Sequence, residues 1–429
     1  MENANTLNPR WNAMEKITFR FVFIFFLLFI AIQNNGAFPF WEYIFKFPTE
    51  LLHQFIPWVG SHVLHLPNEI TVFTNGSGDT TYDYVIVFTI AVTAVLGTTI
   101  WSALDRNRVN YTKLYYWLTV AIRFYVGLML IQYGLVKIIK LQFPSPGIYR
   151  LTQFYGDSSP MGLAWTFLGF SKGYNLFMGI AEVAAVLLLF RRTMTFGAII
   201  TLMTTANVVA VNYCYDVPVK ILSTALFTMT LFLLLRDARR LFSFFFTGTA
   251  VALPVIPAPV LGKRWLKVAR LGIKTLLIGY GLIYGFIEVL DARKQYGDHA
   301  PKPKLYGLYD VDIFIRNNDT IPPLLTDSIR WNQFIIEWEG YANARHMVDS
   351  MSRFFMKLDT LSQQLELTVR ADTTMKYAFA YEMPTSDQLT LTGLMQKDTV
   401  SIFMTRKELD EFLLTNRGFH WVNEFPFNR

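Results

Sequence analysis

Long apolar runs alternate with short polar segments over the first 290 residues or so of the chain. Runs of about 17–25 mostly apolar residues with charges at their ends are typical of helices that cross a bilayer. The pattern predicts seven such helices, at about 17–33, 84–103, 114–139, 174–190, 194–212, 218–235 and 271–290. The first run could be a cleaved signal peptide, but the sequence NNGAFPF that follows is a poor cleavage site, which favours a retained helix.

One further apolar segment, residues 242–260, is not predicted to span. It contains Pro254, Pro257 and Pro259, and proline removes backbone donors and breaks helices. The segment is expected to be interfacial or re-entrant, and counting it as a span would move everything after it to the other side. The basic amphipathic stretch 263–270 that follows is expected to form a surface helix on anionic lipid.

Beyond Asp291 alternation replaces continuous apolarity, as where Val311, Ile313 and Ile315 alternate with Asp312, Phe314 and Arg316. This period of two is typical of half-buried strands. About eight short strands are predicted, near 311–316, 334–338, 342–347, 352–358, 365–370, 377–381, 389–392 and 400–404. Short connections favour an antiparallel meander, shaped as a small lipocalin-like or half-open barrel.

The chain is predicted to end on the barrel. Thr405 and Glu408 have the spacing of a capping box that opens a short helix. Arg417, His420 and Trp421 are expected to dock onto the sheet rather than to form a site.

These patterns define the expected fold class, an α-helical polytopic membrane bundle followed by a C-terminal antiparallel β domain. Four regions are expected. They are two N-terminal helices with an outer loop (1–113), a four-helix core (114–240), an interfacial segment with the seventh helix (241–298), and the β domain (299–429).

Composition agrees with a membrane protein, since 52% of the residues are hydrophobic and only 17% are charged. A soluble domain carries about 25% charged residues. The net charge of +7 would suggest nucleic acid if the cations formed one patch. Instead they occupy alternate loops, around residues 10–20, 106–113, 191–192, 236–240 and 263–270. By the positive-inside rule the N-terminus is cytoplasmic and the β domain lies outside, with no nucleic-acid partner.

Three ionisable residues fall inside predicted spans: Arg123, Lys137 and Glu182. Each costs about 2.5–3.5 kcal/mol to insert, so each needs a partner, a cavity or the interface. Arg123, Gly127, Gly134 and Lys137 share one helix face, and the glycines allow another helix to approach closely.

An outward-facing polar pocket is therefore predicted. Asp216 and Lys220 lie in the connection that returns to the outer side near Glu182 and Lys137. Lys137 and Glu182 are the candidate catalytic residues, and the candidate substrate-binding residues are Arg123, Tyr133, Tyr213, Asp216 and Lys220. Two simpler interpretations remain open, a structural Lys137–Glu182 ion pair and snorkelling of the lysines to the interface.

These residues also carry a family resemblance. Gly134-Leu-Val-Lys137, then Gly179-Ile-Ala-Glu182 and Arg191-Arg192-Thr193, resemble the DoxX family of four-helix membrane proteins over residues 115–240. The Lys-then-acid arrangement is also similar, more distantly, to the membrane domain of vitamin-K-dependent carboxylases. The DoxX resemblance implies a quinone-linked or thiol-linked redox role in a bacterial inner membrane, with a quinone as the cofactor and a periplasmic redox or envelope protein as partner.

The sequence offers few other residues that could bind a cofactor or a metal. None of the six histidines lies in a predicted span, which disfavours bis-histidine haem, and one cysteine, Cys214, cannot run a dithiol cycle. His53, His62 and His65 could bind a metal with a nearby glutamate, although an interfacial helix explains them better; no metal is expected. Whether the protein is an enzyme stays open. The alternative function is a non-catalytic anchor or assembly factor whose β domain binds a partner or an apolar ligand.

Overall fold

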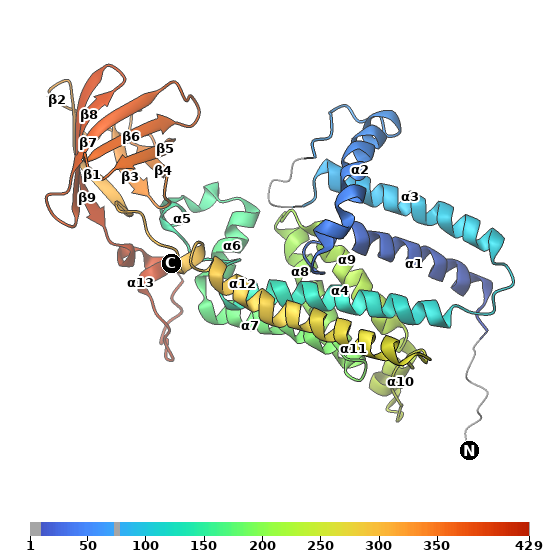
Figure 1. Ribbon diagram of the computed structural model, residues 1–429. Coiled ribbons are helices and arrows are strands. Elements are labelled where there is room, and N and C mark those ends of the chain that lie inside the picture. The colour runs from blue at the N-terminus through green and yellow to red at the C-terminus, as the bar shows by residue number, and fades with distance from the viewer. Residues whose placement is uncertain (1–9, 73–77, 429) are drawn as a thin grey trace. The chain divides into compact units, whose positions relative to one another are not determined.

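The computed structural model describes residues 10–72 and 78–428 (Figure 1). They form two units. The helical unit runs to Phe143 and resumes over Ser159–Asp298, and the barrel unit comprises Pro144–Ser158 together with the chain from His299 onward. The division at His299 coincides with the change from continuous apolarity to alternation. The short segment before Ser159 joins the barrel unit although the sequence places it inside the four-helix region.

The helical unit is built from long apolar helices and a few short ones. Its α-helices are α1 (Ala13–Ile32), α2 (Trp41–His62), α3 (Thr81–Leu104), α4 (Thr112–Ile138), α6 (Pro160–Phe170), α7 (Lys172–Val183), α8 (Met194–Cys214), α9 (Lys220–Leu235), α10 (Ala238–Thr247), α11 (Arg264–Gly279) and α12 (Gly285–Ala292). A 3₁₀ segment, η3 (Ala184–Leu189), continues α7, and a π-helical turn, η4 (Tyr280–Tyr284), joins α11 to α12. Helix α4 is the most buried of the long helices and forms the centre of the bundle.

Within residues 10–72 and 78–428, five helical stretches are long and apolar enough to cross a membrane: α3, α4, α7 with η3, α8, and α11 through α12. A sixth exists if α9 and α10, which meet at 74°, form one broken span. Each of the seven predicted spans corresponds to a helix, but α1 also carries Glu15, Lys16 and Arg20. Helix α9 alone has 16 residues, fewer than a straight crossing needs.

Arg20 lies inside α1 and is buried, yet its charge is satisfied within the bundle. Its guanidinium donates to the Tyr111 hydroxyl at 2.6 Å, to Ser102 at 2.7 Å and to the carbonyl of Asp105 at 2.9 Å. The Tyr111 hydroxyl donates in turn to the Asp105 carboxylate. This network fastens α1 to the connection between α3 and α4.

The basic stretch 263–270 differs from its prediction. It is the first half of α11 and runs into the apolar stretch without a break, because no proline or helix-ending glycine separates the two. Helix α10 exposes Phe242, Phe244, Phe245 and Phe246. Residues 248–262 then lack regular structure, as the three prolines predict.

The β domain is an antiparallel barrel. Its strands are β1 (Gly307–Arg316), β2 (Asp319–Thr320), β3 (Trp331–Ile336), β4 (Tyr341–His346), β5 (Met351–Asp359), β6 (Gln364–Val369), β7 (Lys376–Glu382), β8 (Gln388–Met395) and β9 (Asp398–Lys407). Sequential neighbours pair, β2 is a short hairpin on β1, and β1 also pairs with β9. Eight strands therefore close on themselves, the closed form of the two predicted shapes (Figure 1).

The period-two pattern fills the barrel interior, except in β1, where the register shift after Val311 buries Phe314 and leaves Ile313 45% exposed, against the expected alternation. Trp331, Phe334, Phe354 and Phe379 are almost fully buried and pack around one another, with Trp331 stacked on Phe334 at 5.3 Å between ring centroids. Register shifts occur in β1 between Val311 and Ile313 and in β3 between Trp331 and Gln333. Such bulges bend strands and help a sheet to close.

Two predictions for the end of the chain are wrong. Thr405 does not open a helix, because it is paired in β9 and its hydroxyl donates to Asp312; the capping box is instead formed by Glu408 and Glu411. It opens the 3₁₀ turn η6 (Leu409–Glu411), before α13 (Leu413–Asn416). The segment after α13 does not dock onto the sheet as expected. Trp421 is 91% exposed, and Arg417 contacts the nearby Phe427 ring and Asn423.

Residues 144–158 are fastened to the outside of the barrel. Their short helix α5 (Ile148–Thr152) is followed by a 3₁₀ turn, η2 (Tyr155–Asp157). Ile148 is fully buried against Leu308 and Ile335. The Glu337 carboxylate accepts from the Tyr149 N–H at 3.1 Å, and burial raises the pKa of Glu337. At the other end of α5, Arg345 donates to the Thr152 carbonyl.

Candidate functional site

A buried ion pair joins α4 to α7. The Lys137 ammonium lies 2.7 Å from the Glu182 carboxylate, and both side chains are at least nine-tenths buried. Lys137 belongs to the last turn of α4 and Glu182 to the last turn of α7. A lone charge at such a position would be strongly unfavourable, whereas the pair compensates both charges.

Two glycines bring the paired residues together. A Cβ on Gly134 would lie 2.7 Å from the Gly179 carbonyl oxygen, and a Cβ on Gly179 would lie 2.7 Å from that of Gly134. The backbones of α4 and α7 are therefore in direct contact. Each charged residue follows its glycine by three positions, about one helical turn, which is the face and depth at which a salt bridge can form.

Aromatic rings surround the ammonium group. The Lys137 nitrogen lies 5.6 Å from the centre of the Tyr133 ring and 5.8 Å from that of Phe143. Phe143 packs edge-on against Trp165 at 5.0 Å. Cation–π contacts of this kind strengthen where water is excluded. Tyr133 was a candidate from the sequence, but Phe143 and Trp165 were not, because they lie outside the periodic helix face that pointed to Lys137.

The helix after Glu182 tightens into the 3₁₀ segment η3. It is packed between two glycines: a Cβ on Gly127 would lie 2.8 Å from Leu189, and one on Gly197 would lie 2.7 Å from Leu187. A change to 3₁₀ geometry in the middle of a long helix is often found at functional sites or under strain. Glu182 therefore stands directly before an irregular part of its span.

Arg123 is not placed with Lys137. It lies fourteen residues earlier on the same helix, about 21 Å along the axis at 1.5 Å per residue. Its buried guanidinium donates to the Leu188 carbonyl at the end of η3. This bond holds α4 against the 3₁₀ segment, so the structure assigns Arg123 a structural contact and separates it from the expected pocket.

Asp216 and Lys220 form a second, separate polar group. Their side chains pair at 2.8 Å, but the Asp216 side chain is 84% exposed. Asp79 caps the start of α9 by accepting from the backbone N–H groups of Lys220 and Ile221. Among the described residues no hydrogen bond or ion pair joins this group to Lys137 or Glu182. The single pocket expected from the sequence is thus two polar groups.

Tyr213 belongs to this outer group, since its hydroxyl bonds Thr224 at 3.1 Å and its side chain is exposed. The histidines of α2 lie elsewhere: His62 stacks on Trp58 and bonds Ser61. In the described part of the chain, no three metal-ligating side chains gather into a group that could hold an ion. The exposed Cys214 ends α8.

Part of the chain is similar to a known protein. Over 126 residues, 29% of this chain, it is 39% identical to "Uncharacterized protein YwoB" of Bacillus subtilis, and the match covers 79% of that protein. No family model and no solved structure matches the chain. The name of that protein states no activity.

Proposed function

The chain belongs to the same family as YwoB of Bacillus subtilis, and on the chemistry of its own bundle we propose that it is a DoxX-like membrane protein that binds a quinone headgroup at Lys137 and Glu182. The observation that supports this is the buried ion pair enclosed by aromatic rings. It combines a hydrogen-bond donor, a proton-exchanging carboxylate and flat apolar surfaces in one place. A quinone headgroup has the complementary carbonyl oxygens and flat ring.

In this proposal the residues have separate roles. The Lys137 ammonium would donate a hydrogen bond to a headgroup carbonyl, and the Glu182 carboxylate would hold or release one of the two protons that accompany two-electron quinone reduction or quinol oxidation, the other being exchanged with solvent. The rings of Tyr133 and Phe143 pack on the flat headgroup, and the apolar helices exclude water. A quinone supplies the two-electron chemistry, and a redox or envelope protein partner exchanges the electrons.

One feature favours a quinone over a dithiol cycle within the chain. The chain has one cysteine, Cys214. A dithiol cycle needs two thiols in reach of one another. The distribution of cations supports an orientation with the N-terminus cytoplasmic and the barrel unit on the outer side. A bacterial inner membrane, with the barrel unit periplasmic, is what the DoxX resemblance implies.

The test is the quinone content of the purified protein. Protein extracted from quinone-containing membranes is analysed by mass spectrometry for wild type, Lys137→Met and Glu182→Gln, with Lys220→Met as the matched control from the exposed pair. We expect quinone with wild type and Lys220→Met and a several-fold loss in the two bundle variants. Equal quinone in all four proteins would contradict the proposal.

A second candidate function is a membrane anchor or assembly factor without catalysis. It is favoured by one observation: the barrel unit takes in Pro144–Ser158 as well as the chain after His299, so several chain connections join it to the helical unit. If Lys137→Met and Glu182→Gln leave cellular function intact while removal of residues 300–429 abolishes it, the anchor is supported and the quinone site is rejected.

A further inference from the structure

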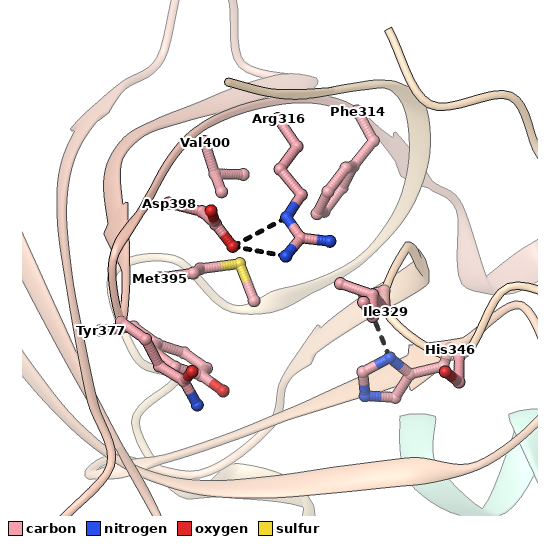
Figure 2. Close-up of a pocket in the computed structure, with 10 residues that line it drawn as sticks. Phe314, Arg316, Ile329, His346, Tyr377, Met395, Asp398 and Val400 are labelled. Carbon is pink, nitrogen blue, oxygen red and sulfur yellow. Dashed lines mark hydrogen bonds and ion pairs between the residues drawn. The ribbon is translucent and has the colours of Figure 1, made fainter. Parts of the chain in front are cut away.

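One end of the barrel contains a cavity of about 270 Å³. Its walls come from the ends of β1, β4, β7, β8 and β9, which meet at this end because neighbouring strands run antiparallel. Figure 2 shows Phe314, Arg316, Tyr377, Met395 and Asp398 around it, with His346 on the facing wall. The volume is that of about nine water molecules at roughly 30 Å³ each, enough for a small ring compound.

The polar side of the cavity is the guanidinium of Arg316, which has one donor nitrogen that makes no hydrogen bond to the described residues. Arg316 donates through Nε and Nη2 to Asp398, at 2.8 and 2.5 Å. Its remaining nitrogen, Nη1, makes no hydrogen bond within the described residues, and Figure 2 shows it turned away from Asp398. Asp398 also accepts from Asn317 at 2.7 Å, and these donors lower the pKa of Asp398.

The charges of Arg316 and Asp398 decide whether a ligand in the cavity can be an anion or must be neutral. Asp398 already neutralises Arg316, so the cavity has no net charge to offer a second carboxylate, and an incoming anion would meet the Asp398 charge. A neutral carbonyl oxygen can still accept from Nη1 without that repulsion. The remaining wall is mixed: the rings of Phe314 and Tyr377 and the thioether of Met395 offer an apolar surface, and Ser328, His346 and Gln396 add neutral polar groups.

The interior next to the cavity also holds an unsatisfied polar group. The Trp331 indole nitrogen is buried without a hydrogen-bond partner among the described residues. Trp331 is paired in register with His346 and contacts Phe354, which contacts Tyr377. Buried donors without partners are rare in folded proteins. This end of the barrel is therefore built with more hydrogen-bonding capacity than the protein itself uses.

From these observations we infer that the barrel cavity binds a small neutral aromatic carbonyl compound, with the carbonyl oxygen on Arg316 Nη1 and the ring between Phe314, Tyr377 and Met395. This site is independent of the Lys137–Glu182 site and does not depend on its function.

The test uses the full chain in lipid nanodiscs and two soluble probes, phenylacetamide and phenylacetate, followed by saturation-transfer NMR. We expect saturation transfer to phenylacetamide and at least tenfold weaker binding of phenylacetate. Met395→Trp fills the cavity and is expected to abolish the signal. The matched control is Leu394→Trp, the adjacent residue of β8, which is exposed and does not line the cavity; it is expected to bind as wild type.

Arg316→Lys keeps the charge opposite Asp398 but removes Nη1, and we expect it to weaken phenylacetamide binding about tenfold. Hydrogen exchange of the β8 and β9 amides verifies that each variant keeps the barrel. The inference is overturned if wild type binds neither probe, if phenylacetate binds as well as the amide, or if Met395→Trp and Leu394→Trp behave alike with the barrel intact.

Discussion

Gly134 and Gly179 contact each other through their backbones, and a Cβ on either would lie 2.7 Å from the carbonyl oxygen of the other. Real Cβ atoms do not approach an oxygen this closely, so neither position can hold a side chain unless α4 and α7 separate. The Lys137–Glu182 pair lies one turn away on both helices. The geometry of the ion pair therefore depends on this helix crossing.

The crossing can be tested with Gly134→Ala. Alanine normally stabilises a helix interior by about 0.8–1 kcal/mol relative to glycine. Here the steric cost is expected to exceed that gain and to lower the free energy of unfolding by about 1–3 kcal/mol. Thermal unfolding in detergent measures the change. The control is Gly272→Ala in α11, whose Cβ would meet nothing within 4 Å; a similar loss in both variants would argue against the crossing.

The buried ion pair is expected to be strongly coupled. Removing one partner, as in Lys137→Met, leaves an uncompensated buried charge and should cost about 3–5 kcal/mol. The double variant with Glu182→Gln should recover much of that loss, because neither charge then remains. A double-mutant cycle on thermal unfolding measures the coupling, and additive effects would contradict it. The exposed pair of Lys220 and Asp216 is the comparison, with little change expected.

Gly147 controls the attachment of α5 to the barrel. A Cβ at this position would lie 1.7 Å from the Glu337 carboxylate oxygen, so Gly147→Ala should displace the carboxylate from the α5 amides. We expect hydrogen exchange at Ile148 and Tyr149 to become roughly tenfold faster, equivalent to about 1.4 kcal/mol. Gly156→Ala is the matched control in the same segment, since its Cβ would meet nothing within 4 Å. Unchanged protection in Gly147→Ala would refute the role of Glu337.

His346 should make the barrel sensitive to mild acid. Burial lowers the pKa of His346 from its ordinary value of 6.5, with hydrogen bonding to the Ile329 carbonyl and the nearby Asp327 opposing the shift. The carbonyl can only accept, so Nδ1 carries the proton, and Nε2 is left to accept from Ser352 at 2.8 Å. A second proton on Nε2 would reverse that bond, so that the Ser352 hydroxyl would have to accept from the imidazolium.

The sign of the pH dependence follows from the direction of the shift. Because the unfolded state binds the proton more readily, stability is complete above about pH 6.5 and falls as the pH drops through the folded pKa. Hydrogen exchange of the β3 and β4 amides between pH 5 and 7, corrected for intrinsic rates, measures this. His346→Gln should remove the loss of stability toward acid in this range: Glu337, whose pKa burial raises, gives a slope of the opposite sign, and Asp327 and Asp398, whose pKa values are lowered, titrate at lower pH. A slope that persists in His346→Gln would assign it to another group.

The membrane topology makes a further prediction. The seven spans expected from the sequence, with the cations inside, would place the barrel unit on the outer side of the membrane. A reporter fused after the barrel should therefore be active only outside the cytoplasm, and one inserted between α3 and α4 only inside. A cytoplasmic signal from the first fusion would require an even number of spans, as when α1 or the bent pair of α9 and α10 does not cross as predicted.

The local pattern of the sequence determines most of the secondary structure. Each predicted apolar run corresponds to a helix and each alternating run to a strand, because the periods of 3.6 and 2 are set by neighbours along the chain. The three prolines after Leu253 likewise specify an irregular segment. The sequence also identified Lys137 and Glu182 as candidates, since charges in apolar spans are costly wherever the span is placed.

Only the tertiary structure decided which of these residues meet. The glycine crossing pairs Lys137 with Glu182, while Asp216 and Lys220 bind each other and Arg123 bonds the Leu188 carbonyl. Strand β1 pairs with β9, and residues 144–158 pack on the barrel; both contacts join segments that are distant in the sequence. Such contacts depend on the shape and register of whole elements, and no local period encodes them.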